Sequence, residues 1–342
     1  MSPKKRSAYV PDNINEEYYQ INPEILNSFS KYRPPVDLFN FREDIAVLAP
    51  FSRKGARLTN EQVEEAAQLC ADGLLFVSRS DHHIYSQHIV KQLDLVLQDN
   101  NLKESEIVDI CIQALQNRYK DFYEQPVKAF FDPLLADILV VTEYIVGDTP
   151  RMNAFVRRLF REHSPQIHAV NTFSVGLWLW LQKTQEIRRK DLDNMAIALL
   201  THDVGMNRTP VFLLNKKGPL KAEEKEKILH HPLHSVKIMQ KMEVVQNDVI
   251  QIIYEHQERM DGSGYPQRLK ANQMSLPARL CALVDSFSAM ITDRPYAVAR
   301  TPLEAANELA MDPRYDADLA RTLVAGCAKD QPGINWCAKK QD

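Results

Sequence analysis

Six residues in the C-terminal half of this 342-residue chain have side chains suited to holding metal ions. Four are histidines within or beside apolar stripes of helical spacing and two are aspartates: His168, His202, His231, His256, Asp203 and Asp285. Imidazole nitrogens together with carboxylate oxygens are the ligand mix suited to Mn, Fe, Ni or Zn. The pattern permits a shared metal site, and it is also compatible with core histidines and helix-terminal acids that serve only the fold.

Apolar periodicity predicts the helices that would position these residues. The expected helices cover residues 168–184, 192–203, 221–231, 247–259, 275–291 and 301–310. Thr301, Pro302 and Glu304 open the last one with a capping box and a proline at the first helical position. The four histidines therefore stand on successive helices, and the first two of these helices are expected to be antiparallel neighbours.

A different pattern precedes this helical part. Between residues 21 and 100, the short strand-like runs VDLFNF, DIAVLAPFS and GLLFVS surround one helix, for which Thr59 is the expected N-cap, Gln62 its capping-box partner and Gly73 the stop signal. We therefore predict a mainly α chain with a C-terminal helical bundle and a small α/β N-terminal module. The expected organisation is a flexible lead-in over 1–20, the module over 21–100, a helical connection over 101–150, the main domain over 151–325 and a tail over 326–342.

The overall composition favours a soluble, cytoplasmic protein. The formal net charge of -3 gives no global attraction to nucleic acid or anionic membrane, so neither is an expected partner. No apolar run approaches the roughly 20 residues that span a bilayer, and no apolar stretch follows the basic residues near the N-terminus, which excludes a secretory signal. The five cysteines are scattered without paired spacing, which is typical of a reducing compartment.

Four motifs, in order, give the chain a resemblance to the HD-GYP family, a branch of the HD superfamily of metal-dependent phosphohydrolases. They are HDVG at 202–205, HHP at 230–232, EHQERMDGSGYP at 255–266 and LVDSFSAMITDRPYA at 283–297. The resemblance covers residues 150 to 325, and HQERMDGSGYP is its most specific part. The segment 52–78 loosely resembles a small domain that precedes some HD-GYP domains.

The resemblance implies an all-helical, HD-type bundle with a dinuclear or trinuclear metal site, whose usual substrate is the bacterial messenger cyclic di-GMP. It implies that the six histidines and aspartates named above are metal ligands. Asp203 would bridge two metals and is the residue assigned to catalysis. Tyr265 of the GYP loop and Arg294 of DRPY would contact the substrate and its phosphate.

Five positions depart from the family pattern. The lysine of HDIGK is replaced by Met206, the second histidine of HHER by Gln257, an upstream glutamate by Ser164, a basic residue by Ala297, and the aspartate of FDA by Ser288. Losing the glutamate argues for two metal ions, with Fe or Mn expected and Ni or Zn as alternatives. Met206 and Ala297 remove two positive charges whose contacts with phosphate are worth roughly 1.5 to 3 kcal/mol each. Gln257 could offer only a neutral amide oxygen as a ligand.

These observations predict a metal-dependent phosphodiesterase of reduced activity that hydrolyses cyclic di-GMP to pGpG, GMP or both. The alternative is a weak or inactive member that binds metal and nucleotide as a signalling or scaffolding module with protein partners. A third reading is hydrolysis of another nucleotide by the altered phosphate site. The oligomeric state is left open by the sequence.

Overall fold

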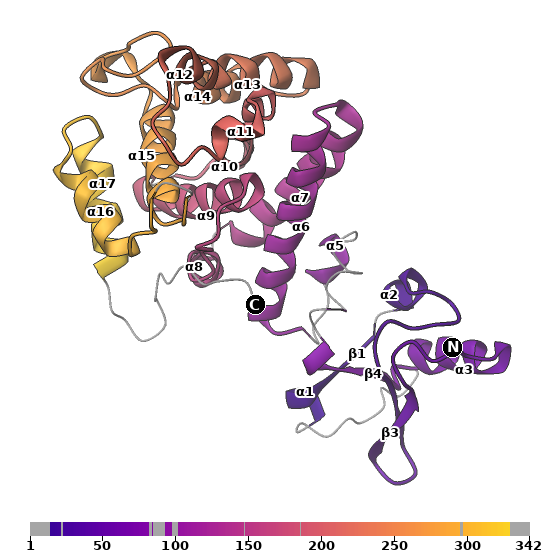
Figure 1. Cartoon of the computed structure of the whole chain (residues 1–342). Coiled ribbons are helices and arrows are strands. Elements are labelled where there is room, and N and C mark those ends of the chain that lie inside the picture. The colour runs from indigo at the N-terminus through magenta and orange to yellow at the C-terminus, as the bar shows by residue number, and fades with distance from the viewer. Residues whose placement is uncertain are drawn as a thin grey trace. The chain divides into compact units, whose positions relative to one another are not determined.

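The computed structural model describes residues 14–21, 23–81, 84, 93–97, 102–146, 148–184, 186–294 and 297–328. The chain divides into two compact units, Met1–Ala114 and Leu115–Asp342 (Figure 1). The division falls inside helix α6 (Glu104–Glu124), within the segment expected to be a helical connection. The two units are described separately below.

The N-terminal unit contains a four-stranded antiparallel sheet of order β1-β4-β2-β3. The strands are β1 (Tyr18–Gln20), β2 (Leu38–Arg42), β3 (Val47–Ser52) and β4 (Leu75–Ser78). The helical elements are α1 (Ile14–Glu17), α2 (Pro23–Ser28), α3 (Asn60–Ala71), the 3-10 turn η1 (Arg79–Asp81) and α5 (Leu93–Val96). Helix α3 packs against β4 and α2, and the fully buried side chains of Tyr19, Leu38, Leu75 and Phe76 form the core of the sheet.

Helix α3 begins and ends as its sequence predicts. The Thr59 hydroxyl accepts a hydrogen bond from the Gln62 amide, and the Gln62 side chain accepts one from the Thr59 amide, which completes the capping box. Gly73 follows the helix with a φ of 74°, the left-handed backbone that favours glycine. The three expected strands are also present, as β2, β3 and β4.

Part of the expected lead-in belongs to this unit. Residues 14–20 form α1 and β1, and Tyr19 is fully buried because β1 pairs with β4. The remainder of the lead-in, residues 1–13, lies outside the described residues. At the other end of the chain, α17 covers the start of the expected tail, and residues 329–342 again lie outside the described residues.

The C-terminal unit is built of helices. They are α7 (Lys128–Ile145), α8 (Thr149–Val156), α9 (Pro165–Lys183), α10 (Arg189–Thr201), α11 (Val211–Leu214), α12 (Ala222–Leu229), α13 (His231–Met239), α14 (Asn247–Glu255), α15 (Leu276–Met290), α16 (Pro302–Met311) and α17 (Ala317–Ala328). Short 3-10 turns lie at η2 (Val204–Arg208), η3 (Gln240–Met242) and η4 (Ala271–Gln273). The expectation of a mainly helical chain with a small α/β module is confirmed.

Helix α9 is the centre of this unit. Every residue from Ile167 to Trp180 is buried, because α8, α10, α15 and α17 pack around the helix. A helix that is apolar on all sides needs such enclosure. Its N-terminal turn therefore brings His168 into the interior, beside the ends of α10 and α15. None of the described helices is long and apolar enough to cross a membrane.

Candidate metal centre

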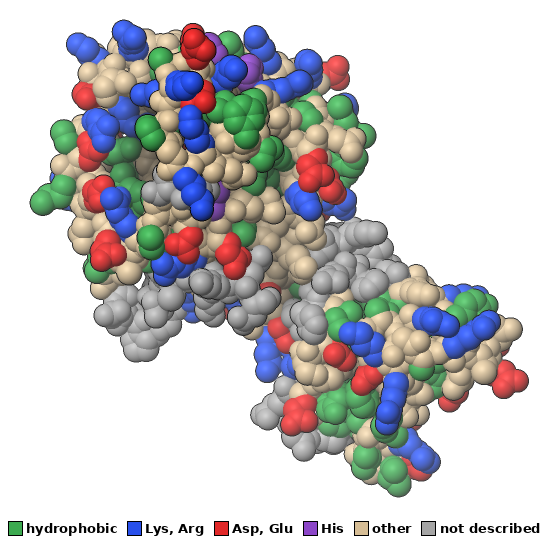
Figure 2. Space-filling view, in the orientation of Figure 1, with side chains coloured by type: hydrophobic (Ala, Val, Ile, Leu, Met, Phe, Trp, Pro, Cys, Tyr) green, Lys and Arg blue, Asp and Glu red, His purple; other side chains and the backbone are tan. Residues whose placement is uncertain are grey.

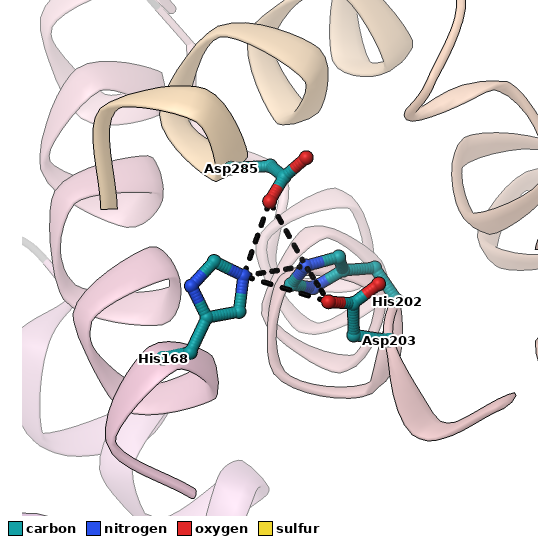
Figure 3. A group of neighbouring side chains, drawn as sticks. All are labelled: His168, His202, Asp203 and Asp285. Carbon is teal, nitrogen blue, oxygen red and sulfur yellow. Dashed lines mark hydrogen bonds and ion pairs between the residues drawn. The ribbon is translucent and has the colours of Figure 1, made fainter. Parts of the chain in front are cut away.

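Four predicted ligands come together from three elements (Figure 3). His168 lies on α9, His202 and Asp203 directly follow α10, and Asp285 lies on α15. The His168 Nε2 atom is 3.1 Å from Asp285 Oδ1, 3.6 Å from Asp203 Oδ2 and 3.3 Å from His202 Nε2. Two imidazoles and two carboxylates thus face one small volume, and we call these four residues the first group.

Asp203 also belongs to a second group, with His231 at the start of α13 and His256 at the end of α14. Asp203 Oδ1 is 3.1 Å from His231 Nε2 and 3.4 Å from His256 Nε2, and these two nitrogens are 3.0 Å apart. The carboxylate therefore turns Oδ2 toward the first group and Oδ1 toward the second. Such a carboxylate is placed to join two cations.

Close packing after α10 brings the second group to Asp203. The turn η2 lies against α13, and a Cβ atom at Gly205 would be 2.3 Å from the His231 carbonyl oxygen, so only glycine fits. The Gly205 amide donates a hydrogen bond to the Ser235 hydroxyl at 2.8 Å, which fixes the turn against the helix. The glycine of HDVG thereby holds His231 beside Asp203.

Three of the four histidines are oriented by their own helices. The Nδ1 atoms of His202, His231 and His256 lie 2.9, 2.8 and 2.6 Å from the carbonyl oxygen three residues earlier. A carbonyl only accepts, so Nδ1 carries the hydrogen and Nε2 turns its lone pair inward. His168 differs, because its buried Nδ1 has no hydrogen-bond partner among the described residues.

This arrangement suits a bound proton or metal ion. In the second group, the Nε2 atoms of His231 and His256 face each other and Asp203 Oδ1, and none of the three atoms brings a hydrogen once Nδ1 is the donor. Acceptors this close repel one another unless a proton or a metal ion lies among them. Nitrogen and carboxylate oxygen bind divalent transition metals, so the His/Asp cluster is compatible with divalent metal binding.

The charges of the groups agree with this interpretation. Burial on its own would raise the pKa of Asp203, but the charges of His202 and His231 hold it well below its usual range. Burial likewise opposes the low pKa of Asp285, which results from its hydrogen bonds with His168 and His202. Burial lowers the pKa of His202, yet Asp203 and Asp285 outweigh it and raise the value to about 9. A proton and a metal ion therefore compete for the Nε2 atom of His202.

Gln257 has a different role from the histidine that it replaces. Its Nε2 amide donates a hydrogen bond to Asp285 Oδ2 at 2.7 Å, while Asp285 Oδ1 faces His168. The opposite amide orientation would place two acceptor oxygens against each other, so the charge of Asp285 fixes the orientation. The residue supports a carboxylate of the first group and does not turn its own oxygen toward it.

The GYP loop is organised by Glu258, which the sequence reasoning missed. This side chain is fully buried and accepts hydrogen bonds from the backbone amides of residues 267, 268 and 269. The Tyr265 amide donates to the Gln257 carbonyl at 3.2 Å, and the Tyr265 ring lies 6.3 Å from the His231 ring. Glu258 stands inside the quoted motif, so its place there was the available signal.

A cavity of about 610 Å³ adjoins both groups. Tyr265, Arg294, Met206 and Gln257 all line it, together with His168, Asp203, His231 and Asp285. Its further cations and aromatic residues are Lys216, Lys217, Arg259, His163, Tyr119 and Tyr123. Both residues predicted to bind the substrate, Tyr265 and Arg294, therefore line the cavity. Two tyrosines and two lysines that were not predicted line it as well.

The other departures from the pattern have local accounts. Ser164 is the N-cap of α9, and its hydroxyl accepts a hydrogen bond from the Ile167 amide at 3.2 Å. Ala297 pairs with Arg294 through two backbone hydrogen bonds, so the arginine is held by a short bridge. Ser288 is buried, and its hydroxyl has no hydrogen-bond partner among the described residues.

The chain is similar to several known proteins. The HD domain family matches residues 150–319. The chain is 33% identical over 150 residues to a cyclic di-GMP phosphodiesterase of Pseudomonas aeruginosa, covering 44% of this chain and 36% of that protein. It is 39% identical over 97 residues to 3'3'-cGAMP-specific phosphodiesterase 1 of Vibrio cholerae, covering 28% and 22%. The matches thus span about a third or less of these relatives' lengths.

A solved structure shares the fold. The HDG"Y"P protein from Bdellovibrio bacteriovorus superposes with a TM-score of 0.58, covering 90% of this chain and 98% of that one. The two sequences are 17% identical, so this likeness concerns the fold alone.

Proposed function

Because the chain belongs to the HD-GYP family, we propose that it is a metal-dependent phosphodiesterase that hydrolyses cyclic di-GMP to pGpG, GMP or both. The observation that carries the proposal is the position of Asp203, whose two oxygens face two separate sets of histidines beside one cavity. Relatives named cyclic di-GMP phosphodiesterases support the substrate.

In this proposal the chain holds two divalent metal ions, with Fe or Mn expected. His168, His202, Asp203 and Asp285 would hold one ion, and Asp203, His231 and His256 the other. Such ions neutralise charge that develops on a phosphodiester and lower the pKa of a water molecule. Position 164 is a serine where the family has a glutamate, and this difference supports two ions over three.

The protein's own residues would grip and orient the substrate. Arg294 would contact a phosphate oxygen and Tyr265 the nucleotide, because both line the cavity beside the ligand groups. Burial and the charges of Asp285 and Asp203 raise the pKa of Tyr265, so its hydroxyl stays neutral and donates a hydrogen bond. A neutral donor adds no negative charge next to a phosphate.

In this proposal, Lys217 offsets part of the charge that is lost at Met206. Lys216 and Lys217 follow α11 and line the same cavity as Met206. Lys216 forms an ion pair with Glu224 at 2.5 Å, which fixes the loop to α12. Lys217 has no ion-pair partner among the described residues, so its ammonium is available to a phosphate. In this proposal, the lysine that contacts the phosphate therefore lies in the loop after α11, and the position in η2 that carries the family's lysine is Met206.

A second candidate substrate is another cyclic dinucleotide. The relatives in Vibrio cholerae include proteins named 3'3'-cGAMP-specific phosphodiesterases. A cavity with a rearranged set of cations, and with Met206 beside it, suits a change in nucleotide preference. Both candidates require the same cleavage of a phosphodiester bond.

The test is hydrolysis of cyclic di-GMP, 3'3'-cGAMP and a mononucleotide, followed by chromatography, on protein loaded anaerobically with Fe(II) or Mn(II). Asp203→Asn is the control, because it keeps the side-chain volume and removes the charge. We expect loss of a cyclic dinucleotide in the wild type alone. Metal binding without loss of any substrate would leave a metal- and nucleotide-binding signalling module.

A further inference from the structure

Helix α6 supplies one wall of the cavity, although it lies outside the HD domain match at 150–319. Tyr119 and Tyr123 come from its last turns, with ring centroids 5.9 Å apart. The helix is tied to the metal centre, because the Asn207 side-chain amide donates a hydrogen bond to the Tyr123 carbonyl at 3.1 Å. Asn207 belongs to η2, the turn that directly follows Asp203 and that also contains Met206. The end of α6 is therefore linked by a hydrogen bond to the turn that follows Asp203.

The hydroxyl of Tyr119 is a buried polar group without a hydrogen-bond partner in the part of the chain that the structure describes. The side chain has no exposed surface, and its Oη atom makes no hydrogen bond with any described residue. A buried hydroxyl without a partner costs free energy, so nearly all such groups in proteins are satisfied by the chain, by water or by a ligand. Tyr119 is one of the residues that line the cavity, so a molecule bound there can supply the missing partner.

The charges around Tyr119 indicate which kind of group its hydroxyl binds. Burial, and then the charge of Asp203, raise the pKa of Tyr119, so the phenol keeps its hydrogen and is a donor. A donor beside a cavity lined by Lys217, Arg259 and Arg294 suits an anionic oxygen. A phosphate carries several such oxygens.

We propose that Tyr119 is a further substrate-binding residue, whose hydroxyl donates a hydrogen bond to a phosphate oxygen of the ligand in the cavity. The identity of that ligand as a cyclic dinucleotide rests on the proposed function. Helix α6 thereby contributes directly to the site. The segment between the two expected domains is then part of the substrate-binding machinery as well as a connection.

The test is the Tyr119→Phe variant, which removes one oxygen atom. Since that oxygen has no hydrogen-bond partner among the residues that the structure describes, we expect the free energy of unfolding in urea to stay the same or increase. A lost hydrogen bond to a charged group corresponds to a fall of about 10- to 100-fold in kcat/KM for the cyclic dinucleotide. Tyr144→Phe on α7 is the matched control, because Tyr144 is buried outside the cavity, and its kcat/KM should not change.

Two results would overturn the inference. One is an unchanged kcat/KM in Tyr119→Phe, and the other is a loss of unfolding free energy that accounts for the loss of activity. If the wild type hydrolyses no cyclic dinucleotide, the proposed function fails, and the inference is tested with inorganic phosphate instead. Phosphate should then raise the melting temperature of the Mn-loaded wild type more than that of Tyr119→Phe, and an equal increase in both would refute the role of Tyr119.

Discussion

The amide of Gln257 lies 2.7 Å from Oδ2 of Asp285, so the residue found where the family has a second histidine supports a carboxylate of the first group. This contact gives a direct prediction. Gln257→Leu keeps the size of the side chain and removes the donor, which frees Asp285 to rotate. Loss of a hydrogen bond that orients a metal ligand weakens metal binding about 10- to 100-fold.

The measurement is competition for Mn(II) with a chelator of known affinity. Gln251→Leu is the matched control, because Gln251 donates a similar hydrogen bond to Glu255, which is not a member of either ligand group. Equal metal affinity in Gln257→Leu and the wild type would show that Asp285 is held by other contacts.

Met206 offers a test of the phosphate grip by gain of function. Met206→Lys returns a positive charge to the cavity wall, and one charge-assisted contact corresponds to a fall in KM of about tenfold or more. The check is the KM for the hydrolysed cyclic dinucleotide, with Met311→Lys, at an exposed position on α16, as the control. A KM that does not fall would mean that Lys217, in the loop after α11, already supplies the needed charge.

Lys217 is predicted to be a residue that supplies this charge. Lys217→Ala should raise KM about tenfold with a smaller effect on kcat, because the ammonium binds the phosphate and does not touch the ligand groups. Lys225→Ala changes an exposed lysine on α12 that does not line the cavity, and it should leave KM as it is. Similar KM values for both variants would remove Lys217 from the account.

Metal affinity should depend on pH. The pKa of His202 is raised to about 9 without a metal ion, so between pH 6 and 8 a bound metal must displace a proton from this residue. The apparent affinity should therefore fall by about tenfold for each unit that the pH is lowered in this range. Chelator competition at pH 6, 7 and 8 measures this slope. An affinity independent of pH would show that His202 is neutral before metal binds.

Glu258 should contribute to stability and to the geometry of the GYP loop. Glu258→Gln replaces one acceptor oxygen by a donor that faces backbone amides, so at least one buried amide loses its partner. The expected loss in unfolding free energy is roughly 1 to 3 kcal/mol, measured by urea unfolding. Glu223→Gln, at an exposed position on α12, should change it by less than about 0.5 kcal/mol. Equal stability of the two variants would contradict the assigned role.

Local patterns predicted the elements well. The capping box of Thr59 and Gln62 and the cap and proline at Thr301 and Pro302 are present, because each depends on residues close together in the chain. The helices expected at His168, His202 and His256 are also present. The placement of His231 at the end of the expected helix 221–231 was wrong, because that helix stops at Leu229 and His231 begins a new helix, α13, in which Pro232 occupies the first turn. The strand β1 was not predicted. Its three residues are held by pairing with β4, some 60 residues later, which no local pattern reports.

The contacts of the centre were less predictable. The ligand types followed from the motifs, but the division of Asp203 between two histidine sets depends on how α10, α13 and α14 pack. The hydrogen bond between Gln257 and Asp285 joins residues on different segments. No sequence pattern marked Tyr119, because only the folded chain shows that this residue lines the cavity and that its buried hydroxyl has no hydrogen-bond partner among the described residues.

The central claim is that Asp203 joins two metal-holding groups in a phosphodiesterase. It is tested most directly by counting metal ions per chain and following cyclic di-GMP in the same anaerobic, Mn-loaded sample, for the wild type and Asp203→Ala. The account predicts about two ions and loss of cyclic di-GMP in the wild type, with fewer ions and no turnover in the variant. Full turnover by Asp203→Ala, or two bound ions in the wild type without loss of cyclic di-GMP, would contradict it.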